Sequence, residues 1–293
     1  MPRNNRGAGG EHFNFASLPR PAILGIINVT PDSFSDGGAF FSTESALSHA
    51  AQLIDEGADA LDIGGESTRP GATPVDVAEE LRRVVPVVKA LRERFPDCVI
   101  SVDTVKGDVA AAVLEEGADM INDVSALRLD PLLAQVCAEA GAGVILMHSR
   151  GSVADMASFD HASYGSDPMS DVIAELGASV TRALHAGISR ERIALDPGIG
   201  FAKRSEHSLA VLGGLARLVA LGFPVAVGVS RKRFIADVAG DRGPSSRLAG
   251  TIAANTMALA GGACIFRVHD VLAARTSLDI AAAILETVGR GKE

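Results

Sequence analysis

The sequence predicts a single (β/α)8 barrel, an α/β fold in which eight parallel strands alternate with helices. Eight short apolar runs recur along the chain, and each is followed by a loop and then by a helical stretch. Such short, nearly continuous apolar runs are typical of strands buried on both faces of a parallel sheet. The chain of 293 residues also has the length of one such barrel, which needs about 250 residues.

The predicted strands end in polar residues, and glycines separate each helix from the next strand. In the two Glu-Gly-Ala-Asp segments, Gly57 and Gly117 stand where a left-handed residue ends a helix just before a strand. The strands are expected at Ala22–Ile27, Ala60–Ile63, Cys98–Val102, Met120–Ile121, Gly143–Met147, Arg192–Leu195, Pro224–Val229 and Ala263–Val268.

An open doubly wound sheet is the alternative fold. It usually carries a GxGxxG turn after its first strand, whereas here the first run is followed by NVTPDSF, residues 28–34. We therefore prefer the barrel. The composition does not change along the chain after a polar, glycine-rich start. We expect a flexible tail over residues 1–17 and one domain over residues 18–293.

Charge and composition exclude several classes of protein. With 27 basic and 36 acidic residues the net charge is −9, which argues against nucleic acid as a partner because phosphate binding needs a basic face. A hydrophobic share of 47% excludes a disordered chain. The three cysteines, Cys98, Cys137 and Cys264, form no CxxC pair. We expect buried free thiols and a reducing, cytoplasmic setting.

Neither a signal peptide nor a membrane span is expected. The N-terminal segment lacks a hydrophobic core region of the kind that signal peptides carry. The uncharged run from Leu248 to Phe266 is long enough for a membrane helix. Its glycines and Asn255 instead favour a buried helix, a turn at Gly261-Gly262 and a buried strand.

A polar residue stands at the end of every predicted strand. In a barrel, these ends meet at one mouth, where the chemistry of such folds takes place. An unpaired buried polar group costs about 1–3 kcal/mol, so a full ring of them predicts a polar ligand. The residues are Asn28, Asp62 with Glu66, Asp103, Asn122 with Asp123, His148, Asp196, Ser230 and His269.

The loops at these ends carry further signals. The first two, residues 28–38 and 64–72, are rich in Gly, Pro, Ser and Asp and longer than a connection requires, so they are expected to be lids. Strand seven is followed by basic residues 231–233, and Arg267 and His269 share one face of strand eight. Together they predict an anion site, because barrels often bind phosphate there. Phe201 follows Gly198 and Gly200 in a predicted tight turn, and it is a candidate to stack against a planar ligand.

Eight motifs in this order resemble those of the dihydropteroate synthases. They are NVTPDSFSDGG, DIGGESTRPGA, SVDT, INDVS, LMH, DPGIGF, GVSRK and RVHD, and the resemblance covers residues 22–285. It implies a TIM barrel that makes 7,8-dihydropteroate and diphosphate from 6-hydroxymethyl-7,8-dihydropterin diphosphate and p-aminobenzoate. It also implies a homodimer. One departure is Ala202, where the family often has glycine.

The resemblance assigns a role to individual residues. The pterin would be bound by Asp103, Asn122, Asp196 and Lys232, of which Asp103 and Lys232 would also be catalytic. The diphosphate would be bound by Thr68, Arg267 and His269. The p-aminobenzoate pocket would consist of Phe34, Arg69, Pro70, Phe201 and Ser230. Mg²⁺ would be the cofactor, held on the diphosphate by Asn28, with Asp36 joining when the first loop closes.

The chemistry of these residues is compatible with such a reaction. Carboxylates and an amide match the donors and acceptors on a pterin edge, and Mg²⁺ prefers oxygen ligands. An aromatic amine is a weak nucleophile, so departure of the diphosphate carries the difficulty. We expect a dissociative substitution at the pterin methylene, with Asp103 stabilising the delocalised cation.

Two other functions compete with the synthase. A methyltransferase barrel that works with a corrinoid protein would share the pterin-binding Asp and Asn positions. It would not need the two long loops or the pair of Arg267 and His269. A catalytically silent pterin-binding homologue should have lost one of the key side chains, yet all are present. The role of His148 stays open, since it could face the ligand or support a residue that does.

Overall fold

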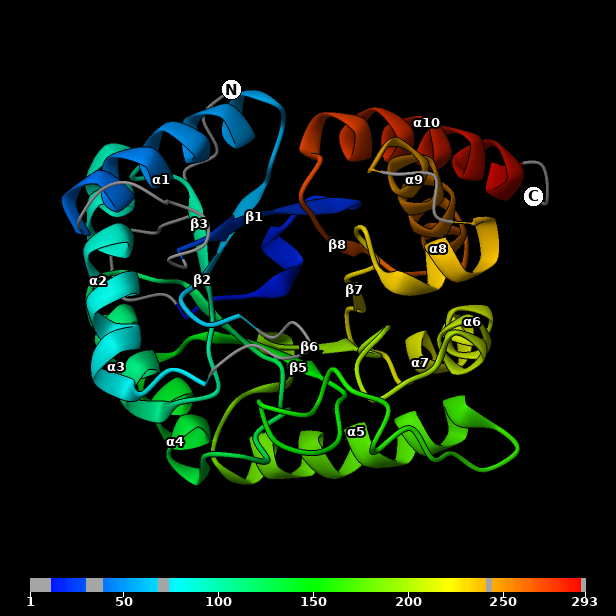
Figure 1. Cartoon of the computed structure of the whole chain (residues 1–293), viewed down its shortest axis with the longest axis horizontal. Coiled ribbons are helices and arrows are strands. Elements are labelled where there is room, and N and C mark those ends of the chain that lie inside the picture. Colours follow the sequence, from blue (N-terminus) through cyan, green and yellow to red (C-terminus); the bar gives the residue numbers. More distant parts are fainter. Residues whose placement is uncertain (1–11, 30–38, 68–73, 241–243, 291–293) are drawn as a thin grey trace.

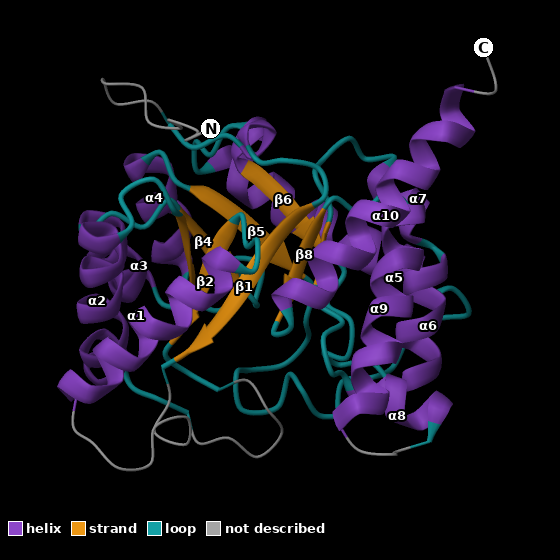
Figure 2. Ribbon diagram, turned by 90° about the horizontal axis from the view of Figure 1, so that it is seen from above, coloured by secondary structure: helices purple, strands orange, loops and turns teal. Residues whose placement is uncertain are grey.

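The computed structural model describes residues 12–29, 39–67, 74–240 and 244–290. Within these ranges, eight parallel strands form one sheet, and helices surround it (Figure 1). The prediction of a (β/α)8 barrel is thereby confirmed. A view turned by 90° shows the strands in the middle with helices on both sides (Figure 2).

The elements alternate as expected, with an additional helix before β7 and before β8. The strands are β1 (Ala22–Asn28), β2 (Ala60–Gly64), β3 (Val99–Asp103), β4 (Met120–Asp123), β5 (Gly143–Met147), β6 (Ile193–Asp196), β7 (Ala226–Val227) and β8 (Ile265–Val268). The helices are α1 (Ala39–Asp55), α2 (Val77–Arg94), α3 (Gly107–Glu115), α4 (Pro131–Ala140), α5 (Pro168–His185), α6 (Ser205–Gly213), α7 (Leu215–Val219), α8 (Arg233–Ala239), α9 (Pro244–Ala260) and α10 (Val271–Arg290). Two short 3-10 turns are η1 (Phe15–Ser17) and η3 (Arg190–Arg192).

The strand order closes the barrel. Neighbouring strands follow the order β6-β5-β4-β3-β2-β1-β8-β7. An isolated bridge between Leu195 and Val225 joins the two ends of this order, and the Leu195 N–H donates to the Pro224 carbonyl at 2.9 Å. The carboxyl ends of all eight strands therefore come together, as the prediction of one common site requires.

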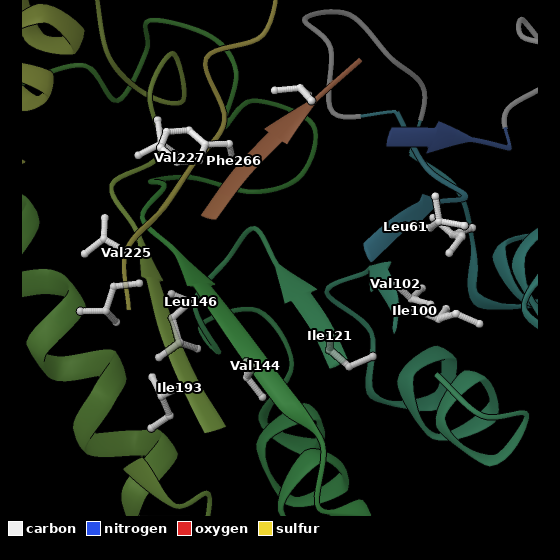
Figure 3. Close-up of a cluster of buried hydrophobic side chains, with 14 of the residues drawn as sticks. Leu61, Ile100, Val102, Ile121, Val144, Leu146, Ile193, Val225, Val227 and Phe266 are labelled. Atoms are coloured by element: carbon white, nitrogen blue, oxygen red, sulfur yellow. The ribbon is translucent and has the colours of Figure 1, made fainter. Parts of the chain in front are cut away.

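Outward-facing side chains form the main hydrophobic core, between the strands and the helices. Ile100, Val102, Ile121 and Val144 belong to this layer and are fully buried, and Figure 3 shows part of the cluster. Because successive side chains on a strand point to opposite faces, the residues between them point into the barrel. This layer explains why the strands read as continuous apolar runs.

The inside of the barrel changes from apolar to polar along the strands. Its base is an apolar cluster that includes Ala60 and Val99. Two residues further along the same strands stand Asp62 and Ser101, both fully buried. The polar layer thus lies on the apolar base and faces the mouth, which positions the candidate functional groups.

Phe15, near the beginning of the described residues, covers the bottom of the barrel. Phe15, in η1, is 2% exposed and packs with the inward-facing residues of the base. The Phe13 N–H donates to the Gly141 carbonyl at 3.0 Å. Phe15 therefore packs against the barrel, although it lies within the tail predicted over residues 1–17. The sequence shows two phenylalanines there, but only the barrel supplies the apolar surface that they cover.

Other sequence predictions agree with the structure, with one adjustment. Gly57 and Gly117 have φ of +99° and +100° and end their helices in the left-handed region. The run from Leu248 to Phe266 forms most of α9, a turn and the start of β8. All three cysteines are free, and Cys98 is only half-buried. None of the helices in the described ranges is long and apolar enough to cross a membrane.

Candidate active site

Three of the predicted pterin-binding residues lie at the carboxyl ends of β3, β4 and β6, at the barrel mouth. Asp103 ends β3, Asn122 lies in β4 beside it, and Asp196 ends β6. Asn122 and Asp196 are 4% and 6% exposed, and the Asp103 side chain is 12% exposed. The structure therefore brings these polar groups into one buried layer inside the barrel.

A charged cluster joins strands that lie far apart in the sequence. The Arg267 guanidinium, on β8, donates from Nε to Asp62 Oδ2 at 2.5 Å and from Nη2 to Asp103 Oδ2 at 3.0 Å. Arg267 was predicted to bind the diphosphate, and here it contacts a residue predicted to bind the pterin. The two substrate regions are therefore contiguous.

Asp62 organises this cluster, although sequence reasoning gave it no role beyond a strand-end polar residue. Its Oδ1 accepts from Ser101 Oγ at 2.5 Å, and its Oδ2 also accepts from Asn122 Nδ2 at 3.3 Å. A carboxylate can only accept hydrogen bonds, so the Asn122 amide turns its NH₂ group towards Asp62. The side-chain oxygen of Asn122 is then available to accept a hydrogen bond from another group.

Burial raises the pKa of two carboxyl groups at the mouth, those of Asp103 and Asp196. Burial raises the pKa of Asp103 to about 7, although the Arg267 charge opposes this rise. Burial likewise raises the pKa of Asp196 to about 6, while the hydrogen bond from the Gly198 N–H and the Lys232 charge lower it. Carboxyl groups whose pKa is strongly shifted and that lie together in a polar layer are typical of functional sites.

Lys232 reaches the same region from the loop after β7. Its Nζ lies 3.8 Å from the centre of the Phe201 ring, a cation–π contact. A Cβ on Gly200 would lie 3.3 Å from Lys232 Cδ, so glycine leaves room for the lysine side chain. Burial and the Arg267 charge together lower the pKa of Lys232 to about 8. The lysine and Phe201 therefore form one wall of the site.

Ser230 and His269 lie together. Ser230 Oγ and His269 Nδ1 are 3.0 Å apart, and Ser230 Oγ accepts from the His269 N–H at 3.3 Å. Ser230 is buried, and His269 is partly exposed at the mouth. The residue predicted for the amine pocket thus contacts the one predicted for the diphosphate.

Comparisons with known proteins agree with this geometry. A model of the pterin binding enzyme family matches residues 24–269. The chain is 45% identical over 256 residues to a dihydropteroate synthase of Synechocystis, with 86% of each chain covered. It is 42% identical to a dihydropteroate synthase of Mycobacterium leprae, covering 92% of this chain and 95% of the relative.

The chain belongs to the pterin-binding enzyme family. A solved structure of Xanthomonas albilineans dihydropteroate synthase with 4-aminobenzoic acid has a TM-score of 0.83 and 44% identity, covering 91% of this chain and 93% of that one. The same enzyme in complex with 7,8-dihydropteroate has a TM-score of 0.80 and 41% identity, covering 91% and 94%. These TM-scores show that this chain shares the fold of both structures.

The loop after β6 is the pterin-binding family's DPGIGF segment, and it turns sharply. Gly198 and Gly200 have φ of +67° and +78°. Ala202, where the family often has glycine, also has a positive φ of +47°. Asp196 Oδ1 accepts from the Gly198 N–H at 2.7 Å. The turn therefore fixes the carboxylate that the pterin would meet.

Replacing Gly198 by alanine is expected to lower the free energy of unfolding by about 2 kcal/mol. A Cβ there would stand 1.8 Å from the His148 carbonyl oxygen, so the turn would have to move. Urea unfolding measures the change. Gly213→Ala is the control, since a Cβ at that helical position meets nothing within 4 Å. Equal stability of Gly198→Ala and wild type would contradict the turn geometry.

Two acidic residues support loops rather than face the ligand. Asp123 is fully buried and accepts from the Ser125 and Leu127 N–H groups at 2.7 and 2.5 Å. Glu66 accepts from the Val75 N–H at 2.7 Å and pairs with Lys106 at 2.8 Å. These carboxylates hold the segments that carry family motifs.

His148 supports its neighbours and does not point to an open site. It is 2% exposed and lies between Lys203 Nζ, 2.8 Å from its Nδ1, and Glu175 Oε2, 3.1 Å from its Nε2. Sequence reasoning missed Lys203 and Glu175. A lysine directly after a glycine-rich turn was the only local signal for Lys203.

The remaining predicted site residues are only partly placed. Asn28 ends β1, and a Cβ on Gly64 would lie 3.8 Å from its Oδ1 and 3.8 Å from Asp103 Cβ. Asn28 is therefore close to the charged cluster. The predicted residues Phe34, Asp36, Thr68, Arg69 and Pro70 lie outside the described residues.

Proposed function

We propose that this chain is a synthase that joins 6-hydroxymethyl-7,8-dihydropterin diphosphate to p-aminobenzoate, giving 7,8-dihydropteroate and diphosphate. The observation that carries this function is the polar layer of Asp103, Asn122, Asp196 and Lys232 at one barrel mouth, next to Arg267. Relatives with more than 40% identity were solved with 4-aminobenzoic acid and with 7,8-dihydropteroate. Such a reaction is a step of folate biosynthesis.

Recognition of the pterin follows from the hydrogen-bonding groups of the layer. Asp103 and Asp196 accept from amino and ring N–H groups, and the Asn122 carbonyl oxygen accepts as well because its NH₂ group faces Asp62. Lys232 donates to a ring nitrogen or oxygen. These four side chains together match the pattern of hydrogen-bond donors and acceptors along one edge of the pterin ring.

The reaction is a substitution at the pterin methylene carbon. The bond from this carbon to the diphosphate oxygen breaks, and the diphosphate leaves with the electron pair. Asp103 stabilises the positive charge that spreads into the pterin ring, while Arg267 and His269 offset the charge of the departing diphosphate. The amine nitrogen of p-aminobenzoate then bonds to the methylene carbon, and the proton that this nitrogen loses passes to solvent water. Phe201 and Ser230 flank the place of attack.

The residues present fit Mg²⁺ bound chiefly through the diphosphate. In the described part of the chain no group of three or more His, Cys, Asp or Glu side chains could hold a metal ion. Mg²⁺ often takes one or two protein oxygens and completes its shell with phosphate and water. The Asn28 amide oxygen would supply one ligand, with Asp36 as the second. The ion would neutralise charge on the leaving diphosphate.

The chain is proposed to be a cytoplasmic homodimer. Its three free cysteines suit a reducing compartment. The helices α9 and α10 lie side by side (Figure 1) and expose large apolar side chains, with Met257 70%, Ile280 62% and Ile284 59% exposed. A second copy would cover this surface. Sedimentation velocity is expected to give twice the mass of the chain, and a monomer at micromolar concentration would reject the dimer.

A direct assay tests the synthase. The protein is mixed with 6-hydroxymethyl-7,8-dihydropterin diphosphate, p-aminobenzoate and Mg²⁺, and diphosphate and dihydropteroate are followed by chromatography, with a chelator as control. Product that needs both substrates and the metal is the expected result. Tight pterin binding without product would instead favour the silent pterin-binding homologue. Diphosphate release without the amine would support the dissociative route.

A further inference from the structure

A fully enclosed lysine holds the loop after β6 from beneath. Lys203 is 2% exposed. Its Nζ donates to the Gly198 carbonyl at 3.0 Å and to the Phe201 carbonyl at 3.2 Å, and it lies 2.8 Å from His148 Nδ1. An ammonium group has three donors, and it meets three acceptors here. Lys203 is thus fully used within the protein and has no donor left for a substrate.

The same contacts fix the state of His148. Because Lys203 donates to Nδ1, the proton of the neutral imidazole sits on Nε2 and is donated to Glu175. Burial and the Lys203 charge together lower the pKa of His148 to about 4. A carboxylate, a neutral imidazole and an ammonium therefore form one chain under the loop.

The charge of Lys203 is compensated around this chain. Burial lowers the pKa of Lys203 to about 7, whereas Asp196 and Glu175 raise it and Arg150 and Lys232 lower it. Arg150 pairs with Glu175 at 2.5 Å and lies over the Tyr164 ring, 4.1 Å from its centre. The lysine is therefore anchored by a network that reaches from β5 to α5.

The loop held in this way presents the wall of the amine site. Lys203 donates to the carbonyls of Gly198 and Phe201, and Gly200 lies between these two residues. Gly200 leaves space for the Lys232 side chain. Phe201 itself receives the Lys232 ammonium on its ring. Asp196 depends less on Lys203, because it is part of β6 and the strand sets its backbone position. A loss of Lys203 should thus disturb Phe201 more than Asp196.

We propose that Lys203 is a positioning residue that, oriented by His148 and Glu175, fixes Phe201 for binding of the amine substrate. Naming the amine as the ligand of Phe201 rests on the proposed function. Lys203 acts through the loop and touches no reacting atom. Its effect is therefore on the amine, and not equally on both substrates.

Lys203→Met tests this role, because methionine keeps an unbranched, buried side chain but has no donor. The KM for p-aminobenzoate is expected to rise at least about tenfold, because a displaced Phe201 ring loses its packing against the aromatic ring of the substrate. The Kd of the pterin diphosphate, measured by calorimetry, stays within about threefold of wild type. An unchanged amine KM, or an equal loss for both substrates, would overturn the proposal. Lys89→Met is the control, since it removes an exposed lysine 3.7 Å from Glu116.

A pair of His148 variants tests the same chain of contacts if Lys203→Met fails to fold. His148→Leu removes the acceptor for Lys203 and is expected to raise the amine KM in the same way. His148→Asn keeps an acceptor oxygen at the same number of bonds from the backbone as Nδ1, and it should restore the wild-type KM. Equal KM values for these two variants would contradict the proposal.

A measurement without turnover separates this role from the proposed function. In nuclear magnetic resonance titrations the pKa of His148 should lie near 4 in the wild-type protein. It should rise in Lys203→Met, because a nearby positive charge is lost. If the wild type makes no dihydropteroate but this shift is seen, the synthase function fails while the Lys203–His148 contact stands. An unchanged His148 pKa would remove the contact itself.

Discussion

Lys232→Ala is expected to lower kcat/KM for the pterin diphosphate by about 10²-fold or more. Among the described residues, Lys232 is the one whose ammonium group lies over the Phe201 ring. This ammonium group also faces the buried layer that holds Asp196. Loss of Lys232 removes the ammonium group that is proposed to hydrogen-bond the pterin, and it takes away one of the positive charges near Asp196, whereas Arg267 stays beside Asp103. Steady-state kinetics with the pterin substrate varied at saturating amine measures the change.

The neighbouring cation provides the control for this experiment. Arg233→Ala removes an exposed guanidinium that lies over Phe159, 3.9 Å from the ring centre, rather than over Phe201. It is expected to change kcat/KM by less than about threefold. If Lys232→Ala turned over as fast as wild type, the assignment of this pocket to the pterin would be wrong. Comparable losses in both variants would point to a general effect of surface charge.

Arg267→Met is expected to lower the free energy of unfolding at neutral pH by about 3–5 kcal/mol, because it leaves two buried carboxylates unpaired. Arg267 contacts Asp62 at 2.5 Å and Asp103 at 3.0 Å, and the Asp62 side chain is fully buried. Methionine keeps much of the volume, so a cavity is not the main cause. Activity should fall as well, since the same guanidinium is proposed to bind the diphosphate.

The stability loss of Arg267→Met should depend on pH with a definite sign. The Arg267 charge opposes the rise in the Asp103 pKa, which is nevertheless about 7. Without Arg267 this pKa rises further, so the folded state binds a proton that the unfolded state releases above its ordinary pKa of about 4. The deficit should therefore shrink as the pH falls from 8 towards 5. Urea unfolding at several pH values measures it.

Two results would contradict this interpretation of the charged cluster. A deficit that grows as the pH falls would show that the carboxylates are not the groups left unpaired. A deficit below about 1 kcal/mol at pH 8 would place Arg267 among the exposed pairs, which contribute little. Arg82→Met serves as the control, since its pair with Glu79 is exposed, and its stability should match that of wild type.

The sequence determined much of the barrel and the ring of polar residues at its mouth. Each strand is a local apolar run, and in a parallel barrel every strand's carboxyl end must reach the same mouth. Asp103, Asn122 and Asp196 could therefore be placed there from the sequence alone. The glycines at 57 and 117 were equally readable, because a helix end needs a left-handed residue at one local position.

Only the tertiary structure decided which of these groups pair. Arg267 and Asp62 stand 205 residues apart, and their contact depends on how β8 and β2 flank β1 in the closed sheet. The sequence around Lys203 gave little indication of its buried role, because its partner His148 lies 55 residues away in the chain. Phe15 looked like part of a tail until the barrel provided a base for it to cover. Periodicity and turn residues are properties of neighbours along the chain, whereas ion pairs and buried donors depend on distances that exist only after the barrel has closed.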